Sequence, residues 1–141
     1  MDNLLLYIYV VHLDELAALV ADLRGEGSDT AEVEVKRAAR AFPDSLTPTL
    51  SAFANTPGGG MVVFGLSEDD GFAAVGVYDP VACKSALAAK ARQAVTPPIT
   101  FDAWDFEFEG TPIVIAKIHG LPAPGKPCRV VSSGKAFLRS Y

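Results

Sequence analysis

Cysteine, histidine and tryptophan are scarce in this sequence. Its 141 residues include two cysteines (Cys83 and Cys128), two histidines (His12 and His119) and one tryptophan. Neither cysteine stands in a CxxC arrangement or at a zinc-ligand spacing from a histidine. The sequence therefore argues against a disulfide framework and against a zinc site, and it predicts two buried thiols. We expect the two histidines to be exposed or to make ordinary hydrogen bonds.

Long hydrophobic runs are also absent. The longest run, residues 4–11, is far shorter than the ~20 residues of a membrane-spanning helix, and no cationic segment or cleavage site flanks it. We expect a soluble, cytoplasmic protein with no membrane partner. Such a run must still be covered, either by the body of the domain or by a second copy in a homodimer.

Acidic residues are missing from the C-terminal part of the chain. The net charge is −5, which disfavours nonspecific binding to nucleic-acid phosphates. After Glu109, however, five residues are basic and none is acidic: Lys117, Lys126, Arg129, Lys135 and Arg139. We therefore expect a local positive surface on an acidic protein.

Hydrophobic periodicity predicts a single α+β domain. Helices are expected over residues 14–24, over about 48–54, and after Asp79-Pro80, where Val81, Leu87, Ala91 and Val95 would face the core. Strands are expected over residues 31–36, 61–66, 72–77, 99–108 and 113–118, with short strands at 128–131 and 136–139. Residues 4–11 fit either a strand or the start of a helix. The predicted fold has a mixed, largely antiparallel sheet and about three helices.

A proline and three glycines join a predicted helix to a buried strand. Residues 52–60 read Ala-Phe-Ala-Asn-Thr-Pro-Gly-Gly-Gly, and the apolar strand follows directly. Glycine permits positive φ and close approach to a phosphate or to neighbouring backbone, so the loop suits either a ligand or a tight connection. Met-Val-Val follows the glycines in place of the Lys-Ser/Thr of a P-loop, which argues against ATP binding or hydrolysis.

Several segments together resemble a known family. They are Glu-Val-Lys at residues 34–36, the 52–60 loop, Val-Phe-Gly-Leu at 63–66, the acidic turn at 68–71, Gly-Val at 76–77 and Phe-Leu-Arg-Ser at 137–140. This pattern resembles the Schlafen/Alba-like DNA-binding domain, which is also labelled a divergent AAA-type ATP-binding domain. The resemblance covers about residues 23–141. It implies a Schlafen/Alba-like domain at 25–141 and a place at the N-terminus of a bacterial transcriptional regulator. The apolar segment and helix at 1–24 precede this region, and we expect one structural domain overall.

The same resemblance implies a candidate metal site. In Schlafen ribonucleases three carboxylates bind divalent metal for phosphodiester cleavage, and the matching positions here are Asp29, Glu34 and either Glu68 or Asp69. Oxygen ligands of this kind suit Mg²⁺ or Mn²⁺, which would activate water while Lys36 stabilises developing charge. A solvated strand face and a polar turn explain the same residues without a metal.

The basic residues and the loop predict a nucleic-acid interface, with DNA or RNA as partner. Its candidate residues are Lys36, Arg37, Arg40, Asn55, Gly58, Gly59, Gly60, Lys135 and Arg139, with Lys117 and Arg129 as further basic residues of the predicted C-terminal strands. Trp104, Phe106 and Phe108 share one strand face, where they either stack on bases or belong to the core. We therefore expect a nucleic-acid-binding module of a transcriptional regulator; the alternatives are a metal-dependent endonuclease and a dimerisation module.

Overall fold

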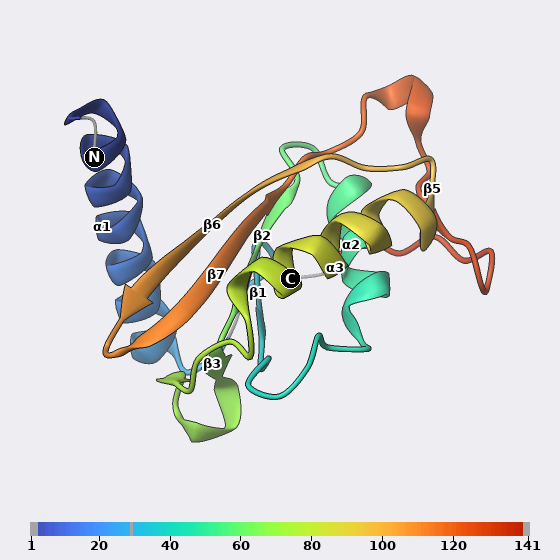
Figure 1. Ribbon diagram of the computed structural model, residues 1–141. Helices are drawn as coiled ribbons and strands as arrows, with labels where there is room; N and C mark the ends of the chain where they lie inside the picture. The colour runs from blue at the N-terminus through green and yellow to red at the C-terminus, as the bar shows by residue number, and fades with distance from the viewer. Residues whose placement is uncertain (1–2, 29, 140–141) are drawn as a thin grey trace.

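A twisted four-stranded sheet lies at the centre of the fold, with helices on both of its faces (Figure 1). The computed structural model describes residues 3–28 and 30–139, with the side chains of residue 4 and of residue 12 onward. The helices are α1 (Asn3–Glu26), α2 (Leu46–Ala54) and α3 (Pro80–Gln93), with 3₁₀ turns η1 (Glu68–Asp70) and η2 (Ala123–Gly125). The strands are β1 (Val33–Lys36), β2 (Gly60–Phe64), β3 (Leu66–Ser67), β4 (Ala73–Ala74), β5 (Val95–Thr96), β6 (Phe101–Phe108), β7 (Thr111–Ile118) and β8 (Arg129–Val130).

The main sheet has the strand order β1-β2-β7-β6. β1 runs parallel to β2, with Glu34 opposite Val62, and the other pairs are antiparallel. Two short antiparallel pairs, β3-β4 and β5-β8, complete the strands of the described residues. The predicted α+β class, with a mixed and mostly antiparallel sheet and three α-helices, is confirmed.

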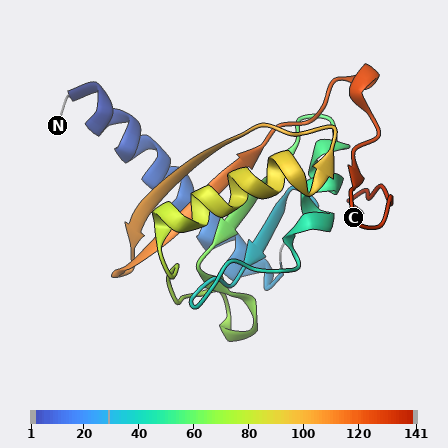
Figure 2. The same cartoon turned by 45° about the vertical axis from the view of Figure 1, so that its right-hand side comes forward.

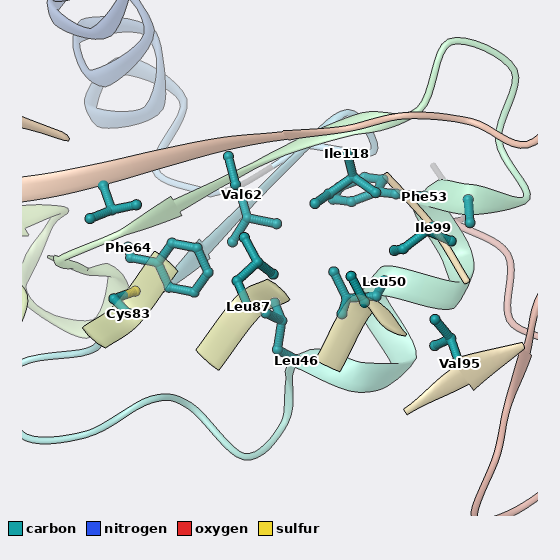
Figure 3. Close-up of a cluster of buried hydrophobic side chains, with 14 of the residues drawn as sticks. Leu46, Leu50, Phe53, Val62, Phe64, Cys83, Leu87, Val95, Ile99 and Ile118 are labelled. Atoms are coloured by element: carbon teal, nitrogen blue, oxygen red, sulfur yellow. The ribbon is translucent and has the colours of Figure 1, made fainter. Parts of the chain in front are cut away.

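The all-apolar sequence of β2 follows from its position inside the sheet. Val62 and Phe64 point into a core formed with α2 and α3, whereas Val63 belongs to the core under α1, and all three are completely buried. Figure 3 shows the first of these cores, where Phe53, Leu87 and their neighbours surround Val62 and Phe64. A strand covered on both faces has no position for a polar side chain.

Helix α1 covers the opposite face of the sheet with its C-terminal half. Leu16, Val20 and Leu23, spaced one helical turn apart, are at most 1% exposed. Arg24 stabilises the position of this end of the helix. Its guanidinium donates to the Phe72 carbonyl at 3.0 Å and forms an ion pair with Glu109. The N-terminal half extends past the edge of the sheet (Figure 2), and Leu4 is 63% exposed.

Of the two alternatives left open for residues 4–11, the structure has the helix. Four local expectations need correction. Helix α1 continues two residues past Arg24 to Glu26. Val81 is 71% exposed, and Cys83 takes the inward position on α3. The 72–77 strand is reduced to the two residues of β4, and Ala136 makes only an isolated bridge to Arg129. No helix of the described residues is long and apolar enough to cross a membrane.

Candidate nucleic-acid interface

The glycine loop between α2 and β2 packs against backbone on one side and faces open space on the other. Gly58 and Gly59 have φ values of 81° and 69°, a region that L-residues rarely adopt. A Cβ on Gly59 would overlap the Ile118 carbonyl oxygen and lie 2.9 Å from the Gly120 nitrogen. A Cβ on Gly58 would meet nothing within 4 Å. The loop therefore needs glycine at 59 for close packing, while Gly58 is available to a ligand.

A groove of about 610 Å³ opens beside this loop, between α1 and the sheet. Its apolar lining is formed by Leu16, Leu19, Met61, Trp104, Phe106 and Ile115, and one wall is the loop from Thr56 to Gly60. Charged side chains border it: Glu15, Glu32, Lys117 and Arg139, with His12 from α1. An apolar depression with a few polar groups is the usual form of a small-ligand site.

Trp104 and His12 form the aromatic part of the groove. Their rings are stacked, with centroids 4.4 Å apart and planes 28° apart. The His12 Nδ1 atom lies 3.6 Å from a Glu15 carboxylate oxygen. Phe106 is buried in the α1 core, whereas Trp104 is only half-buried, so the aromatic face of β6 is divided between core and groove. His119 lies elsewhere, hydrogen-bonded between Thr100 and Asp102.

Arg139 ties the end of the described chain to β1. Its guanidinium donates to the Glu34 carboxylate at 2.6 Å and to the carbonyl oxygens of Thr30, Ala31 and Val33. The same guanidinium lies 5.0 Å from the centre of the Phe53 ring. The Arg139 side chain is therefore already engaged at the border of the groove.

Glu34 is a charged carboxylate with two cationic partners. Burial raises its pKa, but the hydrogen bond from Arg139 and the nearby Lys36 ammonium outweigh this effect, so the net pKa lies below its ordinary value. The Lys36 ammonium is 3.2 Å from Glu34 and also donates to the Ser45 hydroxyl at 2.8 Å. Lys36 and Arg139 thus already balance the charge that a metal would otherwise neutralise.

The other candidate metal ligands lie away from Glu34 or outside the described residues. Asp29 is not among the described residues. Glu68 and Asp69 are exposed in η1, the turn drawn lowest in Figure 1. Within residues 3–28 and 30–139, no group of three or more His, Cys, Asp and Glu side chains is arranged to hold a metal ion. A metal site at these carboxylates remains a prediction.

The residues predicted to bind nucleic acid lie in separate parts of the structure. Gly58, Gly59, Gly60 and Arg139 line the groove, whereas Arg37, Arg40 and Lys135 are exposed away from it. Asn55 is buried. Its side-chain nitrogen donates to the carbonyl oxygens of Cys128 and Phe137, and its side-chain oxygen accepts a hydrogen bond from the Cys128 backbone N–H. These hydrogen bonds join α2 to the C-terminal segment.

The sequence reasoning missed part of the groove. Glu15, Leu19 and Met61 line it although no local motif marks them. Lys117 is exposed on β7 and forms no ion pair with any described residue. The available signals were the single tryptophan and Lys117, the one charged residue of β7.

Comparisons with known proteins agree with this fold. The N-terminal domain of a RecG-related protein from Nitrosomonas europaea, solved by NMR, superposes with a TM-score of 0.70 at 24% identity, covering 88% of this chain and 87% of that one. The crystal structure of the DIP2311 protein from Corynebacterium diphtheriae gives a TM-score of 0.58 at 18% identity, over 92% of this chain but 26% of that one. No curated protein matches the chain. The model of the family described as Schlafen, AlbA_2 matches residues 29–140. The chain therefore belongs to the Schlafen, AlbA_2 family.

Proposed function

We propose that this chain is a nucleic-acid-binding module that contacts the phosphate backbone at the groove beside the glycine loop. The observation that carries the proposal is the position of Lys117, an exposed cation without an ion-pair partner among the described residues, in the same groove as Gly58. A free ammonium and an open backbone segment are two kinds of group that proteins use to contact phosphate. Membership of the Schlafen, AlbA_2 family supports the same class of ligand.

Electrostatics limit the strength of this binding. Glu15 and Glu32 border the groove, and the whole chain carries a net charge of −5. Arg139 adds little free positive charge because it is paired with Glu34. We therefore expect few phosphate contacts, micromolar or weaker affinity at physiological salt, and a further loss of affinity as salt rises.

Within a cell we propose that the module serves a transcriptional regulator and acts as a homodimer. Two copies would present two grooves to one nucleic acid, which compensates for a weak individual site. The sequence feature that favours a homodimer is the apolar run at residues 4–11, which falls in the half of α1 that extends past the sheet.

Fluorescence anisotropy with labelled single-stranded and duplex oligonucleotides tests the proposal. Titrations from low to physiological salt should give binding that weakens with salt, and Lys117→Ala should weaken it and lower the salt slope by about one unit. Lys90→Ala is the matched control, because Lys90 is an exposed lysine on α3, on the opposite side of the sheet. Absence of binding at low salt, or equal losses in both variants, would refute the proposed interface.

A further inference from the structure

We infer that the groove accepts one unpaired nucleobase, stacked on the Trp104 face that His12 now covers. This inference rests on the proposed function and specifies its ligand. The stacked His12 imidazole demonstrates that a planar ring fits against Trp104, with the centroids 4.4 Å apart. Stacking of bases on aromatic side chains is how proteins commonly hold unpaired nucleotides.

The His12 side chain is held by ring contacts with Trp104 and Phe106 and makes no hydrogen bond to the described residues. Its Nδ1 atom is 3.6 Å from the Glu15 carboxylate, longer than a hydrogen bond, and the Glu15 side chain is 65% exposed. The helix that carries His12 is anchored at its other end, where Leu23 is buried and Arg24 contacts Phe72 and Glu109. A rotation of the His12 side chain therefore frees the Trp104 face without dislodging the buried part of α1.

The remaining groups around the groove match the other parts of a nucleotide. Leu19 and Met61 provide apolar surface for the flat faces and edges of a base. The Glu15 and Glu32 carboxylates can accept hydrogen bonds from exocyclic amines, which adenine, cytosine and guanine carry and thymine lacks. Lys117 supplies positive charge for the attached phosphate. A planar ligand with an amine and a phosphate satisfies all of these groups together.

The volume and the stacking geometry favour single strands. A groove of about 610 Å³ has the size of a small-molecule site, so it holds a nucleotide and not a double helix. A base within a duplex is stacked on both faces by its neighbours and must leave the stack to reach Trp104. We therefore expect an oligonucleotide rich in adenine to bind more tightly than oligothymidine, and both to bind more tightly than a duplex.

Trp104 provides a direct probe because it is the only tryptophan in the chain. Titration with unlabelled oligoadenylate should quench its fluorescence over the concentrations at which labelled oligoadenylate gains anisotropy. Trp104→Leu should weaken single-strand binding about tenfold, while Trp104→Phe should retain most of it because an aromatic face remains. His12→Ala should strengthen binding by removing the competing ring.

Phe108→Leu is the matched control. Phe108 shares the Trp104 face of β6 but does not line the groove, so its loss should leave single-strand affinity unchanged. Melting curves of every variant show whether a loss of affinity comes from unfolding. If Trp104→Leu is unfolded, the affinity of Trp104→Phe and the fluorescence quenching of the wild type test the base site instead.

The outcomes separate this inference from the proposed function. Anisotropy showing oligonucleotide binding without any change in Trp104 fluorescence would overturn the nucleobase site and leave the proposed module standing. Quenching by adenosine monophosphate without oligonucleotide binding would support the base site and overturn the module. Equal affinities of Trp104→Leu and wild type for single strands would also overturn the base site.

Discussion

Replacement of Arg139 by methionine tests how strongly the end of the chain is tied to β1. The guanidinium donates to the Glu34 carboxylate and to three backbone carbonyls of residues 30–33, and it lies over the Phe53 ring. Methionine keeps much of the apolar stem but removes every donor. Arg139→Met therefore isolates the charge and hydrogen-bond contribution from the packing contribution.

The expected loss is about 2–3 kcal/mol of unfolding free energy at pH 7. Hydrogen bonds to charged groups contribute about 1.5–3 kcal/mol, and removing one partner of a fully buried ion pair costs about 3–5 kcal/mol. The Glu34 side chain here is 15% exposed and retains Lys36 at 3.2 Å, so the expected loss lies below the cost for a fully buried pair. A double-mutant cycle with Glu34→Gln should give a coupling of about 1 kcal/mol or more.

The loss should also depend on pH in a defined direction. The pKa of Glu34 is lowered in the folded protein from an ordinary value of 4.5. Its pairing therefore stabilises the fold fully above pH 4.5, and this stabilisation is lost as the pH falls through the folded-state pKa. The difference between wild type and Arg139→Met should shrink over that range, leaving only the part due to the backbone carbonyls.

Urea denaturation followed by circular dichroism at pH 7 and at a series of lower pH values measures these quantities. Lys135→Met is the matched control, since Lys135 is an exposed cation close to Arg139 in the sequence and should change stability by less than about 0.5 kcal/mol. The reasoning would be refuted if Arg139→Met behaved like this control, or if its effect were the same at all pH values.

Three further results are expected. Gly59→Ala should destabilise the fold by clearly more than Gly58→Ala, because only a methyl group at position 59 overlaps the backbone. The cost of Gly58→Ala is the ~1–2 kcal/mol of a left-handed conformation. Equal melting temperatures of the two variants would contradict the packing argument. Millimolar Mn²⁺ should neither cleave RNA nor raise the melting temperature, because Glu34 is already paired with two cations; Mn²⁺-dependent cleavage that disappears in Glu34→Gln would establish the nuclease alternative instead. Removal of residues 1–11 should lower the mass measured by light scattering from that of a dimer to that of a monomer, and an identical monomeric mass for the full and shortened chains would rule out dimerisation through this segment.

The strands could be predicted from two patterns. β1 alternates the buried Val33 and Val35 with the partly exposed Glu34 and Lys36, whereas the short, wholly apolar β2 is bounded by glycines and indicated a strand covered on both faces. Residues 4–11 could not be assigned in the same way, since a uniformly apolar segment has neither a helical nor a strand period. They are helical in continuity with Leu16 and Val20, which pack on the sheet.

The groove could not be predicted from any local pattern. Its parts come from α1, the glycine loop, β6, β7 and Arg139, which are adjacent only after the sheet has formed. The stack between His12 and Trp104 depends on the angle and position at which α1 packs across that sheet. Hydrophobic periodicity predicts that a helix forms, but it does not predict this packing. The family resemblance identified the loop but not the aromatic residues that line the same groove.

By itself, the sequence determined the properties that depend on one residue and its neighbours along the chain. Gly59 has to be a residue that tolerates positive φ, and Asp79 followed by a proline starts a helix wherever it lies. Only the tertiary structure decided which charges meet. Arg139 could have been a free cation for phosphate, but it pairs with Glu34, 105 positions away, because the C-terminal segment returns beside β1 and a half-buried carboxylate requires a partner there.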